Sequence, residues 1–225
     1  MKKSNRFLMV LGLFTLLMML FTNFNLVEAY KKIDLSDPFK NYISMEAQSY
    51  RVLKLSGSNG YPIEIRQADE NTCMLLRSRR EHVKLRIHAD TLFIDFTGAS
   101  ISKQQSQASP TSPAIIIQTN SIQEILATDV HCRISDVSRD EMKLSLAGHA
   151  LSELKDCHLN RMQLDIVQQA HMEFLHQNSI DSLELRMANT SIAFLKNVNL
   201  DHIKQDLGDS VSVVLSNYVF RDLVE

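Results

Sequence analysis

The sequence predicts an all-β fold, a single-domain parallel β-helix (β-solenoid) with coils of about 20 residues behind an N-terminal hydrophobic export helix. Two observations in the C-terminal half support the β-helix: apolar positions recur at steps of 20 or 21, and apolar and polar residues alternate within each repeat. Alternation with period two is typical of a half-buried strand. A helical repeat would instead place apolar residues three and four apart and would need about 34 residues or more.

Four apolar columns define the repeat. They are Leu144, Leu164 and Leu185; Leu146, Ile166, Met187 and Leu207; Ile134, Leu154, Phe174 and Phe194; and Leu159, Ile180, Leu200 and Phe220. Stacked coils lie about 4.8 Å apart, so like residues fall on like residues and together bury a core that a single coil could not. We therefore expect Phe174 and Phe194 to be buried one above the other, next to Leu154.

The corners of the coils are expected at Gly148, Gln168, Asn189 and Asp209. Glycine, asparagine and aspartate tolerate the left-handed backbone conformation that such corners often require. Glutamine does not favour it, so we expect a different corner geometry at Gln168.

Earlier strands are less regular. Two are expected within residues 50–67, two more form a hairpin over residues 83–96 around the turn His-Ala-Asp, and residues 101–113 are a polar, proline-bearing surface loop. In the last coil Gln205 takes an inward position that leucines hold elsewhere. We expect residues 216–225 to fold over this final coil, because an open ladder invites edge-to-edge association.

The first residues have the layout of an export segment. A basic start with Lys2, Lys3 and Arg6 precedes an apolar run over residues 7–21, and a small-x-small pattern ends at Ala29. This predicts a signal peptide cleaved after Ala29. An uncleaved anchor stays open, since a spanning helix needs about 20 mostly apolar residues. In both cases the rest of the chain is exported, and the protein is periplasmic, anchored in the inner membrane or at the cell surface.

The expected organisation is therefore a signal peptide or anchor at 1–29, a linker at 30–48 and the β-solenoid domain at 49–225. The stretches HVKLRIHADTLFIDF, SIQEILATDVHCRIS and MKLSLAGHALSEL occur in that order. Together they resemble the bacterial family labelled putative auto-transporter adhesin, head GIN domain, over residues 48–216. The resemblance implies a β-helical envelope protein and carries no catalytic or ligand-binding residue to this chain. The low glycine content departs from the family pattern.

Composition and motifs give little support to catalysis. The formal net charge of −2 gives no reason to expect nucleic acid as a partner. No Gly-x-Ser-x-Gly motif or Cys-x-x-Cys spacing occurs. The basic cluster at 77–82 is interpreted as a solvated hairpin tip that could touch an anionic envelope polymer. We expect no catalytic residue, no cofactor and no metal site.

Three groups of side chains are candidate sites. His131 and His171 should share a face, with Glu153 and Glu173 nearby, but Leu151 lies between the histidines and separates them by about 10 Å, too far for one ion. The outward carboxylates alternate with basic residues. Among these carboxylates, only Glu153 and Glu173 should stack on adjacent coils of one column. Cys73, Cys132 and Cys157 are expected to be buried free thiols, because Cys132 and Cys157 are 25 residues apart and face different sides of the stack.

These observations favour a non-enzymatic binding or scaffold protein of the envelope, adhesin-like, whose partner is an envelope polymer or protein. Its contact with the membrane would be through residues 1–29 if they are not cleaved. A polysaccharide-acting β-helix enzyme and an anchored extracytoplasmic sensory domain stay open as alternatives, because a fold does not by itself decide function.

Overall fold

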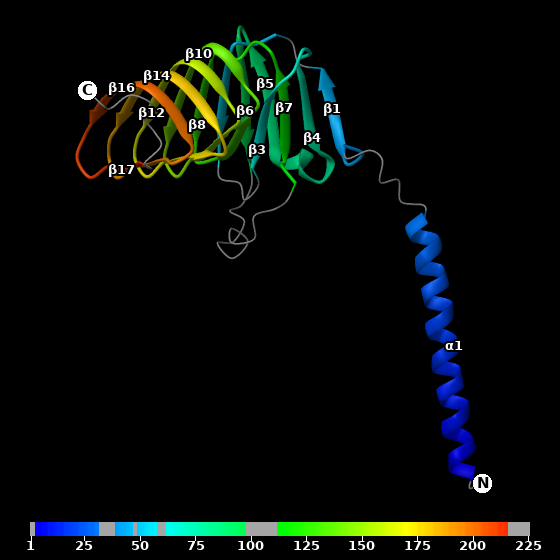
Figure 1. The fold of residues 1–225 in the computed structure, drawn as a ribbon. Coiled ribbons are helices and arrows are strands. Elements are labelled where there is room, and N and C mark those ends of the chain that lie inside the picture. Colours follow the sequence, from blue (N-terminus) through cyan, green and yellow to red (C-terminus); the bar gives the residue numbers. More distant parts are fainter. Residues whose placement is uncertain (1–2, 32–38, 47–48, 58–61, 98–111, 216–225) are drawn as a thin grey trace. The chain divides into compact units, whose positions relative to one another are not determined.

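The computed structural model describes residues 3–31, 39–46, 49–57, 62–97 and 112–215, and it divides into a helical unit and a β unit (Figure 1). The helix α1 (Lys3–Lys31) contains a stretch, Met9–Lys31, that is long and apolar enough to cross a membrane. Its apolar side chains are exposed within the unit. The predicted N-terminal apolar helix is thus confirmed, and its features fit a signal sequence.

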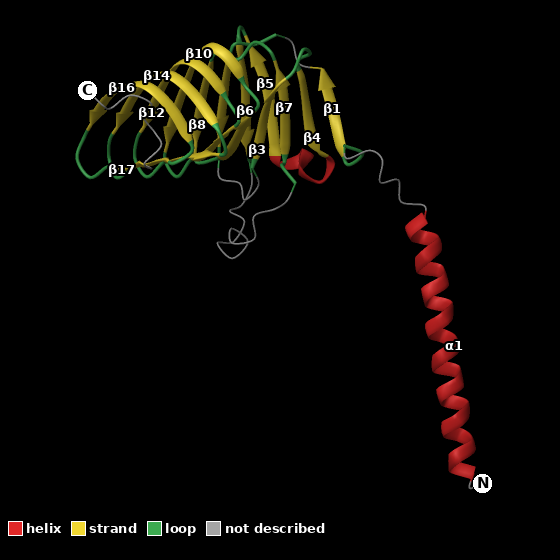
Figure 2. Ribbon diagram, viewed as in Figure 1, coloured by secondary structure: helices red, strands yellow, loops and turns green. Residues whose placement is uncertain are grey.

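The β unit consists of short strands, and one 3₁₀ helix joins two of them (Figure 2). The strands are β1 (Tyr42–Glu46), β2 (Val52–Ser56), β3 (Ile63–Gln67), β4 (Thr72–Leu76), β5 (Val83–His88), β6 (Thr91–Phe96), β7 (Ile115–Thr119), β8 (Glu124–Thr128), β9 (His131–Ser135), β10 (Ser138–Ala147), β11 (Leu151–Lys155), β12 (His158–Ile166), β13 (His171–Leu175), β14 (Asn178–Met187), β15 (Ile192–Leu195), β16 (Val198–Leu207) and β17 (Ser212–Leu215).

The strands form two facing sheets of a β-solenoid, which confirms the predicted fold class. One sheet has the order β1-β4-β7-β3-β9-β11-β13-β15-β17, and the other has the order β16-β14-β12-β10-β8-β2-β6-β5. From β8 onward each coil contributes one strand to each sheet, and neighbouring coils pair in parallel at steps of about 20 residues.

The early coils are stacked out of sequence order. The coil of β2 and β3 lies between the coil of β6 and β7 and the coil of β8 and β9. Three pairs of described strands are antiparallel: β1 with β4, β4 with β7, and β5 with β6 in the predicted hairpin. Strand β1 lies within residues 30–48, so the sheet begins inside the segment expected to be a linker. Most of the expected loop at 101–113 lies outside the described residues.

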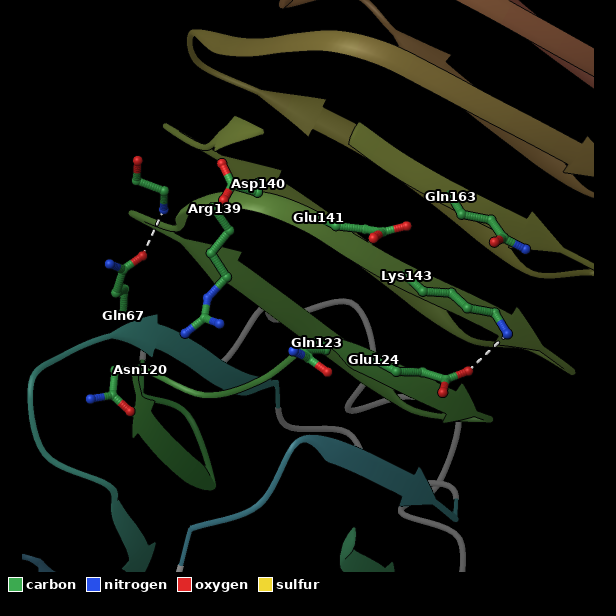
Figure 3. A pocket seen from close by; sticks show the side chains of 10 residues that line it. Gln67, Asn120, Gln123, Glu124, Arg139, Asp140, Glu141, Lys143 and Gln163 are labelled. Carbon is green, nitrogen blue, oxygen red and sulfur yellow. Dashed lines mark hydrogen bonds and ion pairs between the residues drawn. The ribbon is translucent and has the colours of Figure 1, made fainter. Parts of the chain in front are cut away.

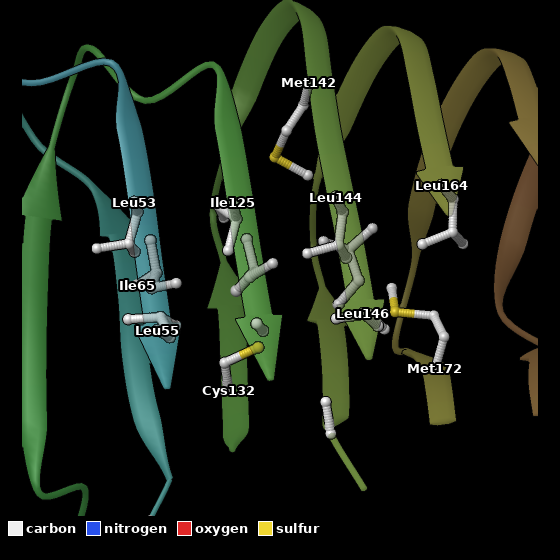
Figure 4. Packing of buried hydrophobic residues seen from close by; sticks show 14 of the residues in the cluster. Leu53, Leu55, Ile65, Ile125, Cys132, Met142, Leu144, Leu146, Leu164 and Met172 are labelled. Atoms are coloured by element: carbon white, nitrogen blue, oxygen red, sulfur yellow. The ribbon is translucent and has the colours of Figure 1, made fainter. Parts of the chain in front are cut away.

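The core is a set of apolar rows that run along the solenoid axis. In one row Leu53, Ile125, Leu144 and Leu164 follow one another on adjacent coils (Figure 4). Leu185 continues this row, and all five side chains are fully buried. Burial of such side chains stabilises the fold by about 1.5–3 kcal/mol each, so the stack supplies the core that one coil lacks.

The prediction for Phe194 is wrong. Leu154 pairs with Phe174, but the next coil is one residue longer, because Leu159 pairs with Ile180 and His171 with Ile192. In an alternating strand a shift of one residue moves a side chain to the other face. Phe194 therefore points outward, where its ring stacks on His171 at 4.9 Å. Leu195 is the buried residue instead.

The corners use left-handed backbone at most of the expected places. Gly148 has φ 67°, Gln168 φ 65° and Asn189 φ 58°, so Gln168 shares the ordinary corner geometry and the expectation of a different one is wrong. In the last coil the left-handed residue is Ser210, beside the expected Asp209. There is a second reason why position 148 requires glycine: a Cβ there would lie 2.2 Å from Oδ1 of Asp129.

The last coil is less buried than the others. Gln205 pairs with Leu185 at the inward position, as predicted, and is exposed. Leu207 and Leu215 are also exposed, at 40% and 49%. The predicted covering segment, residues 216–225, lies outside the described residues.

The basic cluster at 77–82 is not a hairpin tip. Arg77–His82 forms the 3₁₀ helix η1, which joins β4 of one sheet to β5 of the other. Its residues are not buried, so the cluster is a solvated connection between sheets.

The three cysteines are buried, as predicted. Burial raises the pKa of Cys73 to about 12 and those of Cys132 and Cys157 to about 11. The thiolate is the reactive form, so we expect all three to stay free and to react with iodoacetamide at pH 8 only after unfolding. Mass mapping without reductant checks this. A Cys132–Cys157 bridge, or full labelling of the folded protein, would contradict it.

Candidate binding groove

The β unit has an open polar groove of ≈ 690 Å³ beside β10. It arises because β10 is ten residues long and β8 only five. The pairing of β10 with β8 begins at Lys143 with Glu124, whereas β10 pairs with β12 from Ser138 onward. The first half of β10 thus has a strand on one side and, within the described part of the chain, none on the other.

The lining of this groove is polar throughout (Figure 3). Its ten residues are Gln67, Asn120, Gln123, Glu124, Ser138, Arg139, Asp140, Glu141, Lys143 and Gln163. They come from the end of β3, the segment between β7 and β8, and strands β8, β10 and β12. A second, shallower hollow continues along the same corner past His158, Asn160 and Asp181.

Arg139 has the most unusual position in the groove. It pairs with Leu159 on the next coil, and the same column continues with Ile180 and Leu200. These three apolar residues are buried. An arginine thus stands where later coils have apolar residues. Its side chain reaches from β10 toward Gln67 and Gln123 (Figure 3).

The guanidinium of Arg139 is half-buried, and the part of the chain that the structure describes offers it no counterion. Burial lowers the pKa of Arg139, and no hydrogen-bond or ion-pair partner of its side chain occurs among the residues that the structure describes. Arginine stays charged in proteins despite such a shift. The groove therefore contains a fixed positive charge with its hydrogen-bond donors available.

The amides around Arg139 keep part of their hydrogen-bonding capacity. Gln67 accepts a bond from the backbone N–H of Ser138 (2.7 Å) through its Oε1, which leaves its NH₂ group for a ligand. Asn120 donates to the backbone carbonyl of Asp69 (3.0 Å), which leaves its Oδ1. The Gln123 side chain has no partner within the described residues. These groups supply both donors and acceptors.

The other charges of the groove are partly engaged. Lys143 forms an ion pair with Glu124 at 2.9 Å. The hydrogen bond to Glu124 and the negative charge of Glu124 raise the pKa of Lys143. Asp140 accepts a hydrogen bond from Asn160 at 2.9 Å. The arrangement can hold a polar ligand by many hydrogen bonds and one charge contact.

The candidate histidines His131 and His171 do not come together. His131 pairs with Leu151, and Leu151 pairs with His171, as predicted. Each histidine has its own contact: His131 bonds Glu153 at 2.9 Å, and His171 stacks on Phe194. Among the described residues, no group of three or more His, Cys, Asp or Glu side chains could hold a metal ion.

The outward carboxylates are dispersed in mixed-charge rows. Glu153 and Glu173 do stack on adjacent coils. Burial would raise the pKa of Glu153, but the hydrogen bonds and charges of His131 and Arg133 outweigh it and lower that pKa. Glu184, between Arg186 (2.7 Å) and Lys204 (3.5 Å), also has a lowered pKa, chiefly through its hydrogen bond with Arg186.

The periodic pattern does not predict the groove, although the sequence contains one signal for it. The column of Leu159, Ile180 and Leu200 extends backward by 20 residues to Arg139. A charged residue in a predicted apolar column indicates a site that is open to solvent or to a ligand. The length difference between β8 and β10 was not visible in the pattern.

Comparison with solved structures supports the fold. The chain is similar to a putative adhesin from Parabacteroides distasonis, with 15% identity, a TM-score of 0.60, and coverage of 77% of this chain and 71% of that one. Weaker similarity links it to a putative lipid binding protein of the same species (13% identity, TM-score 0.45, 80% and 95% coverage) and a putative adhesin from Bacteroides fragilis (10%, 0.44, 81% and 96%).

No family model and no curated protein matches the chain. The resemblance to the head GIN domain family therefore stays a resemblance. At 15% identity the first Parabacteroides distasonis protein, with its TM-score of 0.60, shows a shared β-solenoid fold.

Proposed function

We propose that this chain is a non-enzymatic binding or scaffold protein of the bacterial cell envelope, carried there by α1. The observation that supports it most is the division into an apolar helix able to span a membrane and a separate solenoid with a polar groove. The description of the Parabacteroides distasonis protein as a putative adhesin agrees with this proposal.

The carboxyl groups favour binding over catalysis. A general acid in a glycosidase needs a raised pKa. Among the described residues, the carboxyl groups with shifted pKa values are Asp95, Glu153 and Glu184, and all three pKa values are lowered. Of the carboxylates that line the groove, Glu124 pairs with Lys143 and Asp140 is bonded by Asn160, whereas Glu141 has no partner among the described residues. Envelope polymers or proteins are the partners that this location makes available.

A binding and turnover assay tests the proposal. The full chain, purified in detergent, is incubated with envelope fractions of the native host, and bound protein and released sugars are measured together. We expect saturable binding and no change in the sugars over hours. Release of oligosaccharides would favour the polysaccharide-acting alternative. A lack of saturable binding would contradict a binding function.

A further inference from the structure

We propose that the groove beside β10 binds a carboxylate-bearing glycan, with the guanidinium of Arg139 holding the carboxylate of a uronic acid unit. This inference rests on the proposed function, because it names the class of polymer that the solenoid binds. It follows from three features of the groove: a cation with no counterion among the described residues, the polar groups around it, and a lining of ten polar or charged residues.

A half-buried arginine at position 139 has a cost in folding free energy. Its guanidinium is half-buried, its pKa is lowered by burial, and the described residues offer it no counterion. The same column has Leu159, Ile180 and Leu200 in later coils, so an apolar residue fits the architecture. A charge that is desolvated without a partner opposes folding, and such costs are typical of functional positions.

The charges that line the groove favour a ligand with a carboxylate. Arginine presents a planar fork of N–H donors that matches a carboxylate with two parallel hydrogen bonds. The other cation of the groove, Lys143, is already paired with Glu124. Asp140 and Glu141 line the same groove, and neither has a basic partner among the described residues, since Asp140 is bonded by the neutral Asn160. These two charges disfavour a densely anionic ligand such as a polyphosphate. One carboxylate per binding unit suits this balance.

The polar lining of the groove favours a glycan over a peptide. All ten lining residues are polar or charged. Peptides bound along a strand edge are recognised through pockets for alternate side chains, which usually include apolar ones. Sugar hydroxyls both donate and accept, so they can pair with the free NH₂ of Gln67, the Oδ1 of Asn120 and the amide of Gln123.

Binding is measured by isothermal titration of the full chain in detergent with tetramers of galacturonic, glucuronic and mannuronic acid. Each tetramer is compared with its carboxyl-reduced, neutral counterpart. We expect at least one acidic tetramer to bind and its neutral counterpart to bind at least tenfold more weakly. An acidic peptide of equal charge is the third probe. Binding of the peptide without any tetramer, or of no probe at millimolar concentration, would overturn the inference.

Variants assign the contact to Arg139. Arg139→Gln should weaken binding of the acidic tetramer at least tenfold, about 1.4 kcal/mol. Arg161→Gln removes the same charge from an exposed position of β12 that does not line the groove, and it should leave affinity within twofold. Equal losses in both variants would mean general charge attraction and would overturn the proposal.

A stability measurement separates loss of contact from loss of fold. Arg139→Leu restores the residue type of the column, so it should abolish binding and raise Tm by about 2–4 °C. A lower Tm would show that Arg139 serves the fold, against our inference. Failure of all glycan arms would leave the envelope-binding proposal intact, since that is judged by saturable binding to whole envelope fractions.

Discussion

Phe174→Ala is expected to lower the free energy of unfolding of the β unit by about 3–5 kcal/mol, because it leaves a cavity in a packed core. Phe174 is fully buried and stands on Leu154 in the stack. Phe and Trp to Ala changes in protein cores have costs of this size, and they exceed those of most single substitutions. Urea denaturation followed by circular dichroism measures the loss.

Phe194→Ala is the matched control. Phe194→Ala removes the same atoms, but from the outward face of the next coil, where the ring of Phe194 contacts His171 and Lys196. We expect a loss below about 1 kcal/mol, as for surface aromatic contacts. Equal losses in the two variants, or a larger one at Phe194, would mean that the 21-residue coil is misplaced and that the simple 20-residue register holds.

Asn178→Ala is expected to cost about 2–4 kcal/mol, because Asn178 satisfies several buried backbone groups at a corner. Its side chain accepts a hydrogen bond from the N–H of Cys157 (3.0 Å). It donates to the carbonyls of Leu175 (2.9 Å), Leu154 (3.2 Å) and Asn197 (3.3 Å). Alanine fills part of the space but supplies neither donor nor acceptor.

Asn199→Ala provides the comparison, since Asn199 is exposed on the neighbouring strand β16. Its loss should change the free energy of unfolding by less than about 0.5 kcal/mol, as is usual for surface positions. Thermal and urea denaturation of both variants give the difference. Similar stabilities would show that backbone groups around Cys157 and Asn178 find other partners, and the corner network would then not matter to the stack.

The repeat was predictable because stacking imposes the same residue type on every coil. The rows through Leu144 and Leu146 follow the predicted register. The prediction for Phe194 was wrong for a local reason. One residue is added between Leu175 and Ser179, because Lys155 pairs with Leu175 but His158 pairs with Ser179. An added residue in a corner leaves no trace in alternation until the next strand, where it exchanges the two faces.

The order of the early coils could not be predicted from periodicity. A column shows which residues are equivalent, but it does not say that β2 and β3 lie between coils formed by later segments. That order depends on which edges are left to pair after the chain turns back through β4 and β5. The groove is similar: Arg139 was visible as an irregular member of a column, but its exposure depends on where β8 begins.

Export of the solenoid by α1 is the central claim, and fractionation of the native host with N-terminal sequencing and external protease tests it most directly. We expect the chain in the envelope or outside the cell, with a mature start at Tyr30 or an intact start at Met1. External protease should reach the solenoid once the outer barrier is opened. A full-length chain in the cytosolic fraction, protected from protease in cells with permeable outer layers, would contradict the account.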